Sequence, residues 1–326
     1  MRSVKLIAAK AGQLLIVLWA VATVLFLIFR LMPGNPLAAF IDPSFTQEQQ
    51  TALMAEFGLD KPLFQQYLIY LVNLLHLDFG VSFFYHSPVS DLVFAVFPNT
   101  LLLTFSALIL AYVVGILLGA LVARQRGTWI EATVLPIVLV LRAAPEFWVG
   151  MILLAIFSFS LGWFPAGGAT SAGAEFTGLF GRLFTLDFLA HLFLPALTLA
   201  LYLLGLPLLL MRSTMLEVLD EDFVTMARMK GFPEWTVVLR HAARNALLPV
   251  ATAFALGIGY SIGGNVVIET VFSWPGLGRL LVRAVQGHDY PLAQGAFLLI
   301  AFVMILMNAT ADLIYRLLDP RVAHAG

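Results

Sequence analysis

The 326-residue sequence contains no cysteine, few charged residues and almost no net charge. Without cysteine there is no disulfide framework and no thiolate metal site. Charged residues make up only 11% of the chain, against roughly a quarter in soluble proteins, and a net charge of −1 gives no reason to expect a nucleic-acid partner. The six histidines are scattered singly and show no metal-binding spacing. These absences exclude a disulfide-stabilised fold and a zinc site built on thiolates, and they give no support to a nucleic-acid-binding function.

A Walker A motif is also missing, because no lysine follows a glycine anywhere in the chain. This polypeptide therefore does not hold ATP phosphates by that route. The string Gly259-Tyr260-Ser261-Ile262-Gly263 has the G-x-S-x-G pattern of serine hydrolases, but that motif needs a turn between a strand and a helix. Here it lies in an apolar helical run, where glycines four residues apart favour close helix packing, as at Gly115 and Gly119. We predict no enzyme activity, cofactor or metal in this chain.

Apolar residues make up 61% of the sequence and gather into six runs long enough to cross a bilayer, which takes about 20 residues. The runs cover approximately Ala11–Phe29, Thr100–Val122, Thr133–Phe159, Leu192–Met211, Leu248–Val267 and Leu292–Tyr315. The first run lacks a small-residue cleavage site and is interpreted as an uncleaved span. The predicted fold class is all-α, a polytopic membrane protein with six transmembrane helices forming a single domain over residues 1–326.

The distribution of lysine and arginine predicts which loops lie inside the cell. With six spans and both termini inside, twelve of these residues are cytoplasmic, five lie outside or at the outer boundary, and Arg142 lies within the third span. Because basic residues accumulate on the cytoplasmic side, we predict an N-in, C-in protein of the bacterial inner membrane. Residues 33–98 then form an extracytoplasmic loop with short helices, one of them from Thr46 to Phe57. Residues 212–247 form a cytoplasmic loop.

The long polar segment from Leu216 to Pro249 predicts two short helices joined by a turn. The first helix opens on acids and closes on bases, an order that suits the helix dipole. Gly231 stands where a helix end favours positive φ, and Pro233 is predicted at the first position of the second helix. One face of the second helix is predicted to carry apolar side chains, namely Trp235, Val238, Leu239 and Ala242. Another face carries Arg240 and Arg244.

The residues alone leave two interpretations of this hairpin open. It is either a docking element for another protein or a solvated connector between spans. The docking interpretation rests on an apolar ridge, Phe223 and Met226, with the small residue Ala227 beside it and charged residues around the rim.

The same stretch resembles the coupling loop, or EAA loop, of ATP-binding-cassette (ABC) importer permeases, and is most similar to the dipeptide/oligopeptide/nickel branch. That branch has a pattern like E-D-Y/F-V-x-T-A-R-A-K-G, nine residues, then H-A-x-R-N-A-L-x-P. The matching residues are Glu221, Asp222, Phe223, Val224, Ala227, Arg228, Lys230, Gly231, His241, Ala242, Arg244, Asn245, Ala246, Leu247 and Pro249. Met226 and Met229 depart from the pattern.

Other stretches resemble the same family along nearly the whole chain. They are Phe29–Pro36, Phe57–Pro62, Leu77–Ser82, Pro98–Leu101, Glu269–Gly278, Asp289–Pro291 and Asp319–Arg321. The resemblance implies the fold of a type I ABC importer permease. It also implies four kinds of partner: a second permease that is a related but different chain, two ATP-binding subunits that hold ATP and Mg, an extracytoplasmic solute-binding protein, and the lipid bilayer. The implied cargo is a dipeptide, an oligopeptide or a similar small solute.

The resemblance also assigns roles within the hairpin. Phe223, Met226 and Ala227 are expected to fit a groove on an ATPase subunit, and Gly231 to permit the turn. Arg228, Lys230, His241 and Arg244 are expected to orient the contact, and Glu221 and Asp222 are counted with them among the ATPase-coupling residues.

Four polar residues inside the apolar runs are candidates for the substrate path. Arg142 and Glu146 are predicted to lie one turn apart in the third span, around Pro145, and Asn265 and Glu269 one turn apart in the fifth. An intramembrane charge costs about 2.5–3.5 kcal/mol on insertion scales, so such residues are seldom without a role. The alternative for each pair is a structural one, through ion pairing or interhelical hydrogen bonds.

Two other function classes compete with the permease subunit. A self-sufficient ion-coupled transporter would need intramembrane carboxylates such as Glu146 or Asp312. An intramembrane hydrolase would use Ser261. The family resemblance and the long cytoplasmic hairpin favour the permease subunit of an ATP-driven importer over both.

Overall fold

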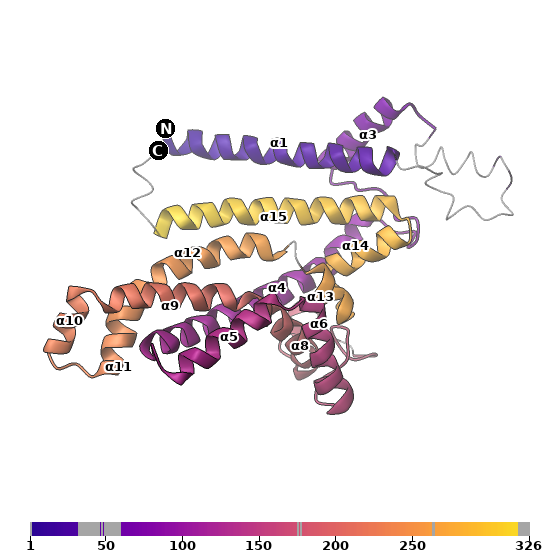
Figure 1. Cartoon of the computed structure of the whole chain (residues 1–326). Coiled ribbons are helices and arrows are strands. Elements are labelled where there is room, and N and C mark those ends of the chain that lie inside the picture. The colour runs from indigo at the N-terminus through magenta and orange to yellow at the C-terminus, as the bar shows by residue number, and fades with distance from the viewer. Residues whose placement is uncertain are drawn as a thin grey trace. The chain divides into compact units, whose positions relative to one another are not determined.

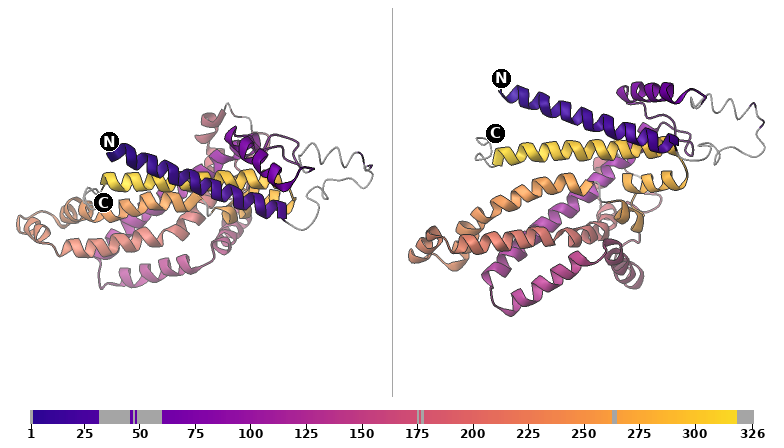
Figure 2. Two further views of the ribbon diagram at one scale, coloured as in Figure 1. Left: turned by 90° about the horizontal axis from the view of Figure 1, so that it is seen from above. Right: turned by 45° about the horizontal axis from the view of Figure 1, so that its top comes forward.

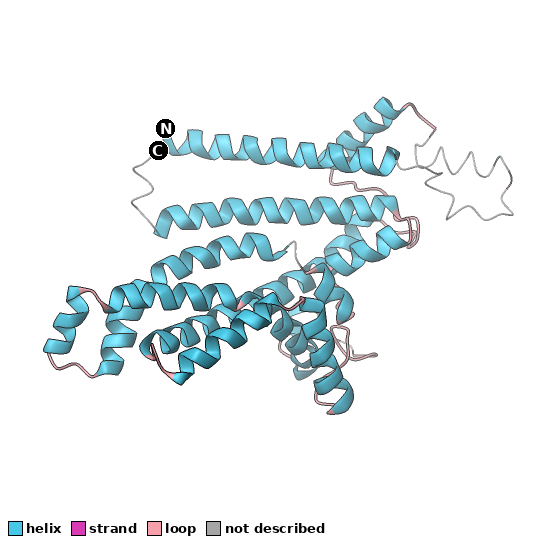
Figure 3. Cartoon of the chain, in the orientation of Figure 1, coloured by secondary structure: helices cyan, strands magenta, loops and turns pink. Residues whose placement is uncertain are grey.

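The computed structural model describes the backbone of residues 2–31, 46, 48, 60–174, 176, 178–262 and 265–318. The helix predicted from Thr46 to Phe57 lies outside this part of the chain except at two of its positions. Within the described residues every regular element is a helix, apart from one isolated bridge between Val81 and Pro88 (Figure 3). The all-α prediction is therefore confirmed for this part of the chain.

The helices follow one another along the chain as labelled in Figure 1. They are α1 (Arg2–Leu31), α3 (Leu63–Leu75), α4 (Val89–Arg124), α5 (Trp129–Ala143), α6 (Glu146–Leu153), the π-helix η1 (Leu154–Ser160), α7 (Gly178–Leu183), α8 (Leu186–Leu203), α9 (Gly205–Leu219), α10 (Asp222–Met229), α11 (Glu234–Thr236), the π-helix η2 (Val237–Ala242), α12 (Ala243–Ile262), α13 (Val266–Val271), α14 (Leu277–Gln286) and α15 (Tyr290–Leu318).

Four described helices are long and apolar enough to cross a membrane: Gly12–Leu31, Val89–Arg124, Leu186–Leu203 and Tyr290–Ala311. The pair α5 and α6–η1 would add a fifth span if its two parts are one. The predicted span Leu248–Val267 falls on α12 and α13, between which residues 263 and 264 are not described. The total of six spans and the N-in, C-in orientation stay predictions.

The third predicted span, Thr133–Phe159, is wrong as a single helix. The chain breaks after Ala143, and the two parts are bent by 106°. Ala144 takes extended backbone, with φ −70° and ψ 140°, and Pro145 caps α6. The physical reason is local, because a proline ring clashes with the preceding residue in the α conformation and offers no N–H to the ladder. By contrast, Pro195 lies inside α8, which continues past it.

The structure divides into two units, Met1–Pro98 with Gly276–Ile305 and Asn99–Pro275 with Leu306–Gly326. In the first unit, α1 packs on α3 through aromatic side chains. The ring of Phe26 lies 5.3 Å from that of Tyr67 and 5.5 Å from that of Tyr70, and Thr23 Oγ1 lies 2.7 Å from the Tyr67 hydroxyl. Phe29 contacts Tyr290, so the end of α1 also meets the start of α15.

In the second unit, α4 and α9 approach closely at the two glycines that the sequence singled out. A Cβ at Gly115 would lie 2.8 Å from the ring of Pro207, and one at Gly119 would lie 2.6 Å from the backbone oxygen of Leu208. Only glycine lets these helix backbones come so near, which confirms the packing role expected of this pair. On the cytoplasmic side of this contact in the predicted topology, Met211 and Met215 of α9 are fully buried.

Candidate functional site

The polar hairpin predicted from Leu216 to Pro249 is present and consists of α10, a turn, and α11 with η2. It projects beyond the ends of α9 and α12, as Figures 1 and 2 show. Glu221 is the N-cap of α10, with Asp222 in the first turn and Arg228 in the last, as the dipole argument predicted. Glu221 and Asp222 are both exposed.

The turn after α10 is a Schellman motif built on Gly231. Its φ is +77°, the left-handed region that glycine adopts without a Cβ clash. The Gly231 N–H donates to the Arg228 carbonyl at 2.9 Å, and the Phe232 N–H donates to the Ala227 carbonyl at 3.4 Å. These two bonds satisfy carbonyls that the helix end leaves open. Pro233 follows as the N-cap of α11, one position earlier than predicted.

A side-chain pair spans the same turn. The Arg228 guanidinium donates to both Glu234 carboxylate oxygens, at 3.1 and 3.4 Å. Both side chains are more than two-fifths exposed, and exposed pairs of this kind contribute about 0–1 kcal/mol. The backbone motif therefore fixes the turn, and the ion pair adds little.

The inner side of the hairpin is apolar and buried. It is formed by Val224, Ala227, Val237, Val238, Ala242 and Ala246, packed with Met211 and Met215 of α9 and Ala120 and Ala123 of α4. Ala227 is only 5% exposed. Its side chain is enclosed by the chain's own helices in this conformation, and the expectation that Ala227 fits a partner's groove stays a prediction.

The outer side carries large apolar side chains that the chain itself leaves exposed. We call this set the apolar hairpin surface; its members are Phe223, Met226, Met229, Phe232, Trp235 and Leu239. Their exposed fractions run from 41% at Phe223 to 82% at Met229. Phe223 and Met226 thus lie where the docking interpretation expected them. Exposed apolar side chains gathered on one polar segment are typical of a protein-binding surface.

The face predicted for the second helix is wrong at two positions. Trp235 and Leu239 are exposed, whereas Val237 shares the buried side with Val238 and Ala242. The cause is η2, in which each turn holds more residues than in an α-helix and the side chains rotate relative to a regular period. A regular 3.6-residue period therefore assigns the wrong neighbours to Val238.

A cation–π contact ties the hairpin to the end of α4. The Arg124 guanidinium carbon lies 4.1 Å from the centre of the Trp235 ring. On the other side of the hairpin, Thr214 Oγ1 of α9 donates to the Ala246 carbonyl of α12 at 3.1 Å. Arg124 was not predicted to have this role, and the sequence offered no signal for it beyond its position at the basic end of α4.

The remaining rim residues surround the outer surface. Lys230 and Arg244 are exposed. Arg240 shares the predicted basic face with Arg244 but does not belong to the rim, and it is exposed as well. His241 is half-buried, with its ring 5.5 Å from that of Phe232.

The pair predicted one turn apart in the third span is separated by the helix break. Arg142 lies in the last turn of α5 and Glu146 begins α6, so the two do not share a helix face. Arg142 is exposed, and its aliphatic chain lies over Gly205, where a Cβ would come within 2.8 Å of the arginine Cδ. Glu146 is half-buried. Among the described residues no ion pair joins the two side chains.

Asn265 and Glu269 are one turn apart, as predicted, and both are buried. The Glu269 N–H donates to the Asn265 carbonyl at 2.9 Å. Thr100 Oγ1 of α4 donates to Glu269 Oε1 at 2.7 Å, and the Asn265 amide donates to Thr104. Both side chains therefore take part in hydrogen bonds between α13 and α4.

The comparison with known protein families covers most of the chain. Residues 115–324 match the family described as "Binding-protein-dependent transport system inner membrane component". Residues 3–104 match the corresponding N-terminal family, described as "Binding-prot-dependent transport system membrane comp, N-term".

Individual proteins are similar over nearly their full length. The chain is 38% identical over 309 residues to the oligopeptide transport system permease protein AppB of Bacillus subtilis, covering 94% of this chain and 96% of that protein. It is also 38% identical to the di/tripeptide transport system permease protein DppB of Pseudomonas aeruginosa, covering 98% of each. Among solved structures, a chain of the inward-facing MetNI methionine ABC transporter matches with a TM-score of 0.52 at 18% identity. The match covers 68% of this chain and 93% of that one, and it supports the fold alone.

Proposed function

The chain belongs to the family of binding-protein-dependent transport system inner membrane components, and we propose that it is a peptide-translocating permease subunit of an ATP-driven importer. Members of this family are membrane permeases and not catalysts. The peptide cargo is inferred from the relatives, two of which are named as oligopeptide and di/tripeptide permeases. The bacterial inner membrane is the location that the family name supports.

The proposed partners are a second, related permease chain, two ATP-binding subunits that hold ATP and Mg, and an extracytoplasmic solute-binding protein. The observation that carries the ATPase assignment is the apolar hairpin surface. Large apolar side chains stand exposed on a segment that is otherwise polar and is predicted to be cytoplasmic. In water such a surface is stabilised by a partner that covers it.

The hairpin is held rigidly, so a movement of a bound ATPase subunit would be passed on to the helices against which it packs. The Schellman turn at Gly231 fixes the angle between its two arms, and the buried side holds both arms against α4 and α9. Closure of an ATPase dimer would thus displace the hairpin together with those helices and open the path alternately to the two sides. Arg228, Lys230, His241 and Arg244 would orient the contact from the rim, with Glu221 and Asp222 at the opposite end of α10.

For the cargo path we propose Arg142 and Glu146, which stand on either side of the helix break. A break of this kind exposes backbone groups and brings two charged side chains to the ends of separate helices. Asn265 and Glu269 would contribute only if α13 moved away from α4, since both are now engaged there.

The test is purification of the tagged chain from its native membrane in mild detergent, followed by identification of the proteins that accompany it. We expect ATPase subunits in stoichiometric amounts and a second permease. Met226→Asp and Met229→Asp should lose the ATPase subunits, whereas Arg240→Gln, an exposed change outside the apolar hairpin surface, should retain them. Full retention by both aspartate variants would contradict the docking role.

The competing function is self-sufficient, ion-coupled transport. Proteoliposomes that contain the purified chain alone would then accumulate a labelled dipeptide when an ion gradient is imposed. We expect no accumulation under those conditions, and accumulation only when the ATPase subunits, the second permease, the binding protein and ATP are all present.

A further inference from the structure

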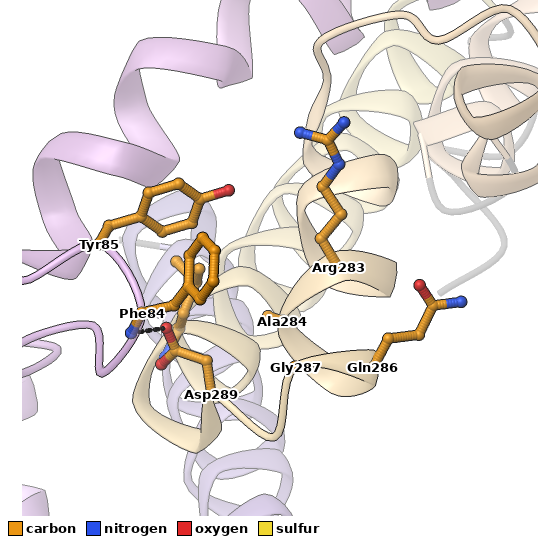
Figure 4. A pocket seen from close by; sticks show the side chains of 8 residues that line it. Phe84, Tyr85, Arg283, Ala284, Gln286, Gly287 and Asp289 are labelled. Atoms are coloured by element: carbon orange, nitrogen blue, oxygen red, sulfur yellow. Dashed lines mark hydrogen bonds between the residues drawn. The ribbon is translucent and has the colours of Figure 1, made fainter. Parts of the chain in front are cut away.

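A cavity of about 260 Å³ lies within the first unit, between the loop before α4 and the polar side of α14 (Figure 4). Its lining is formed by Phe84, Tyr85, Arg283, Ala284, Gln286, Gly287, Asp289 and Leu292. In Figure 4 the two aromatic rings stand on one side, and Arg283 and Gln286 project from α14 on the other. In the predicted topology this whole region is extracytoplasmic.

The buried carboxylate of Asp289 holds the two walls together. Asp289 is 1% exposed and accepts hydrogen bonds from Ser82 Oγ at 2.5 Å, from the Phe84 N–H at 3.1 Å and from the Leu292 N–H at 3.3 Å. Ser82 and Asp289 are 207 residues apart in the sequence. Since Ser82 and Phe84 both donate to this carboxylate, the loop that carries Phe84 and Tyr85 is fixed against the turn between α14 and α15 before any partner arrives.

Both segments that close the cavity contain a residue other than glycine in the left-handed region. His86 has φ +50° and His288 has φ +57°. The His288 turn is held by two backbone bonds, from the His288 N–H to Val285 at 3.2 Å and from the Asp289 N–H to Ala284 at 2.8 Å. Such conformations cost about 1–2 kcal/mol for a non-glycine residue and are enriched at binding sites.

The open side of the cavity is cationic. Arg283 is exposed, and Arg279 precedes it by one turn of α14. Burial lowers the pKa of the Arg279 guanidinium, and the positive charge of Arg283 lowers that pKa further. An anion bound at Arg283 would reduce this repulsion. The opposing charge of Asp289 is enclosed and bonded, so the guanidinium of Arg283 is the charge that an approaching group meets first.

We infer that this cavity receives a carboxylate side chain of the extracytoplasmic solute-binding protein, held by Arg283 and Gln286 and flanked by Phe84 and Tyr85. The inference rests on the proposed function, which supplies the partner. Arginine and tyrosine dominate binding energy at protein interfaces, and Phe84 and Tyr85 are 65% and 37% exposed. Arginine also binds carboxylates through two parallel hydrogen bonds.

The size of the cavity favours a protein side chain over the cargo. Pockets that enclose small-molecule ligands usually measure about 300–1,000 Å³, and this one is smaller. It therefore admits the tip of one side chain and leaves the body of a peptide outside. A fixed loop with exposed aromatic rings suits a surface that meets a preformed partner, because little ordering remains to be done on binding.

The experiment measures binding of the purified cognate solute-binding protein to the complete transporter in nanodiscs. Arg283→Glu should raise Kd by about tenfold or more, and Arg283→Gln by a smaller factor, with reduced sensitivity to salt in both. The matched control is Lys61→Glu, the same charge reversal at an exposed residue of the same unit and the same predicted side; it should leave Kd within about twofold.

Unchanged Kd in both Arg283 variants would overturn the inference. It would also be overturned if the loss seen in nanodiscs with anionic lipid disappeared in zwitterionic ones, since Arg283 would then bind a lipid phosphate. A raised KM for a labelled dipeptide at saturating binding protein, with Kd unchanged, would assign the cavity to the cargo instead. Co-purification of the ATPase subunits reports separately on the proposed function, so the two ideas can fail independently.

Discussion

Replacing Gly231 tests whether the geometry of the hairpin turn couples ATP use to transport. A Cβ added at Gly231 would meet nothing within 4 Å, so the cost of Gly231→Ala comes from the backbone alone. At φ +77° that cost is about 1–2 kcal/mol, which changes the ratio of closed to open turn by about 5–30-fold. Asparagine tolerates this conformation better, so Gly231→Asn should have the smaller effect.

Gly231→Pro should be the most damaging of the series. Proline fixes φ near −65° and removes the N–H that donates to Arg228, so the turn cannot form at all. Because the change lies outside the predicted spans, we expect insertion into the membrane to proceed while peptide uptake and its coupling to ATP hydrolysis are lost.

Two measurements test this series, one of the stability of the turn and one of the coupling between ATP hydrolysis and transport. In Gly231→Ala, the rate of hydrogen exchange at the amides of residue 231 and Phe232 should rise by about 5–30-fold. Peptide uptake per ATP hydrolysed should fall in the order Asn, Ala, Pro. The matched control is Gly127→Ala: Gly127 has φ +78° and open space around its Cβ position, but it lies in the turn between α4 and α5.

The reasoning would be refuted if Gly231→Ala exchanged like the wild type. It would equally fail if Gly127→Ala uncoupled transport as strongly, because the effect would then belong to any strained turn on the side predicted to be cytoplasmic.

Three further predictions concern the same hairpin and its support. Ala227→Asp buries a carboxylate in an apolar cluster and should lower stability by at least about 2 kcal/mol in thermal unfolding, whereas Met226→Asp should leave the unfolding temperature unchanged; equal effects would contradict the two orientations. A double-mutant cycle of Arg124→Ala and Trp235→Ala, read by hydrogen exchange, should give a coupling of about 0.5–1 kcal/mol; additive effects would exclude the cation–π contact. Gly119→Leu should separate α4 from α9, since even a Cβ lies 2.6 Å from a backbone oxygen there; an unchanged unfolding temperature would disprove that packing.

Local features of the hairpin were predictable because each depends on near neighbours in the chain. The acids and bases at the ends of α10, the positive φ of Gly231 and the position of Pro233, to within one residue, follow from dipole, cap and ring chemistry. Pro145 could be seen in the sequence only as a proline inside the third apolar run. The 106° bend depends on how the helices after the break pack, so the angle cannot be read from the spacing of residues in the sequence.

The sequence predicted where helices lie better than it predicted which side of each helix is buried. A regular period placed Trp235 on one face with Val238, whereas η2 rotates the second arm of the hairpin. Ala227 is covered by helices of the same chain, which its position in the sequence does not reveal. For Arg142 and Glu146, a spacing of four residues suggested one helix face, but the intervening proline assigns them to different helices.

Four features could be recognised without a structure: the class of protein, the approximate apolar segments, the hairpin between two of them and the family to which the chain belongs. These follow from composition, local chemistry and motif spacing, which do not require distant contacts. The folded chain was needed to show which hairpin side chains are enclosed and which remain for a partner, and to bring Ser82 next to Asp289 beside a cavity. The physical reason is that burial is a property of residues brought together from far apart, and a side chain's own neighbours in the chain do not specify what will cover it.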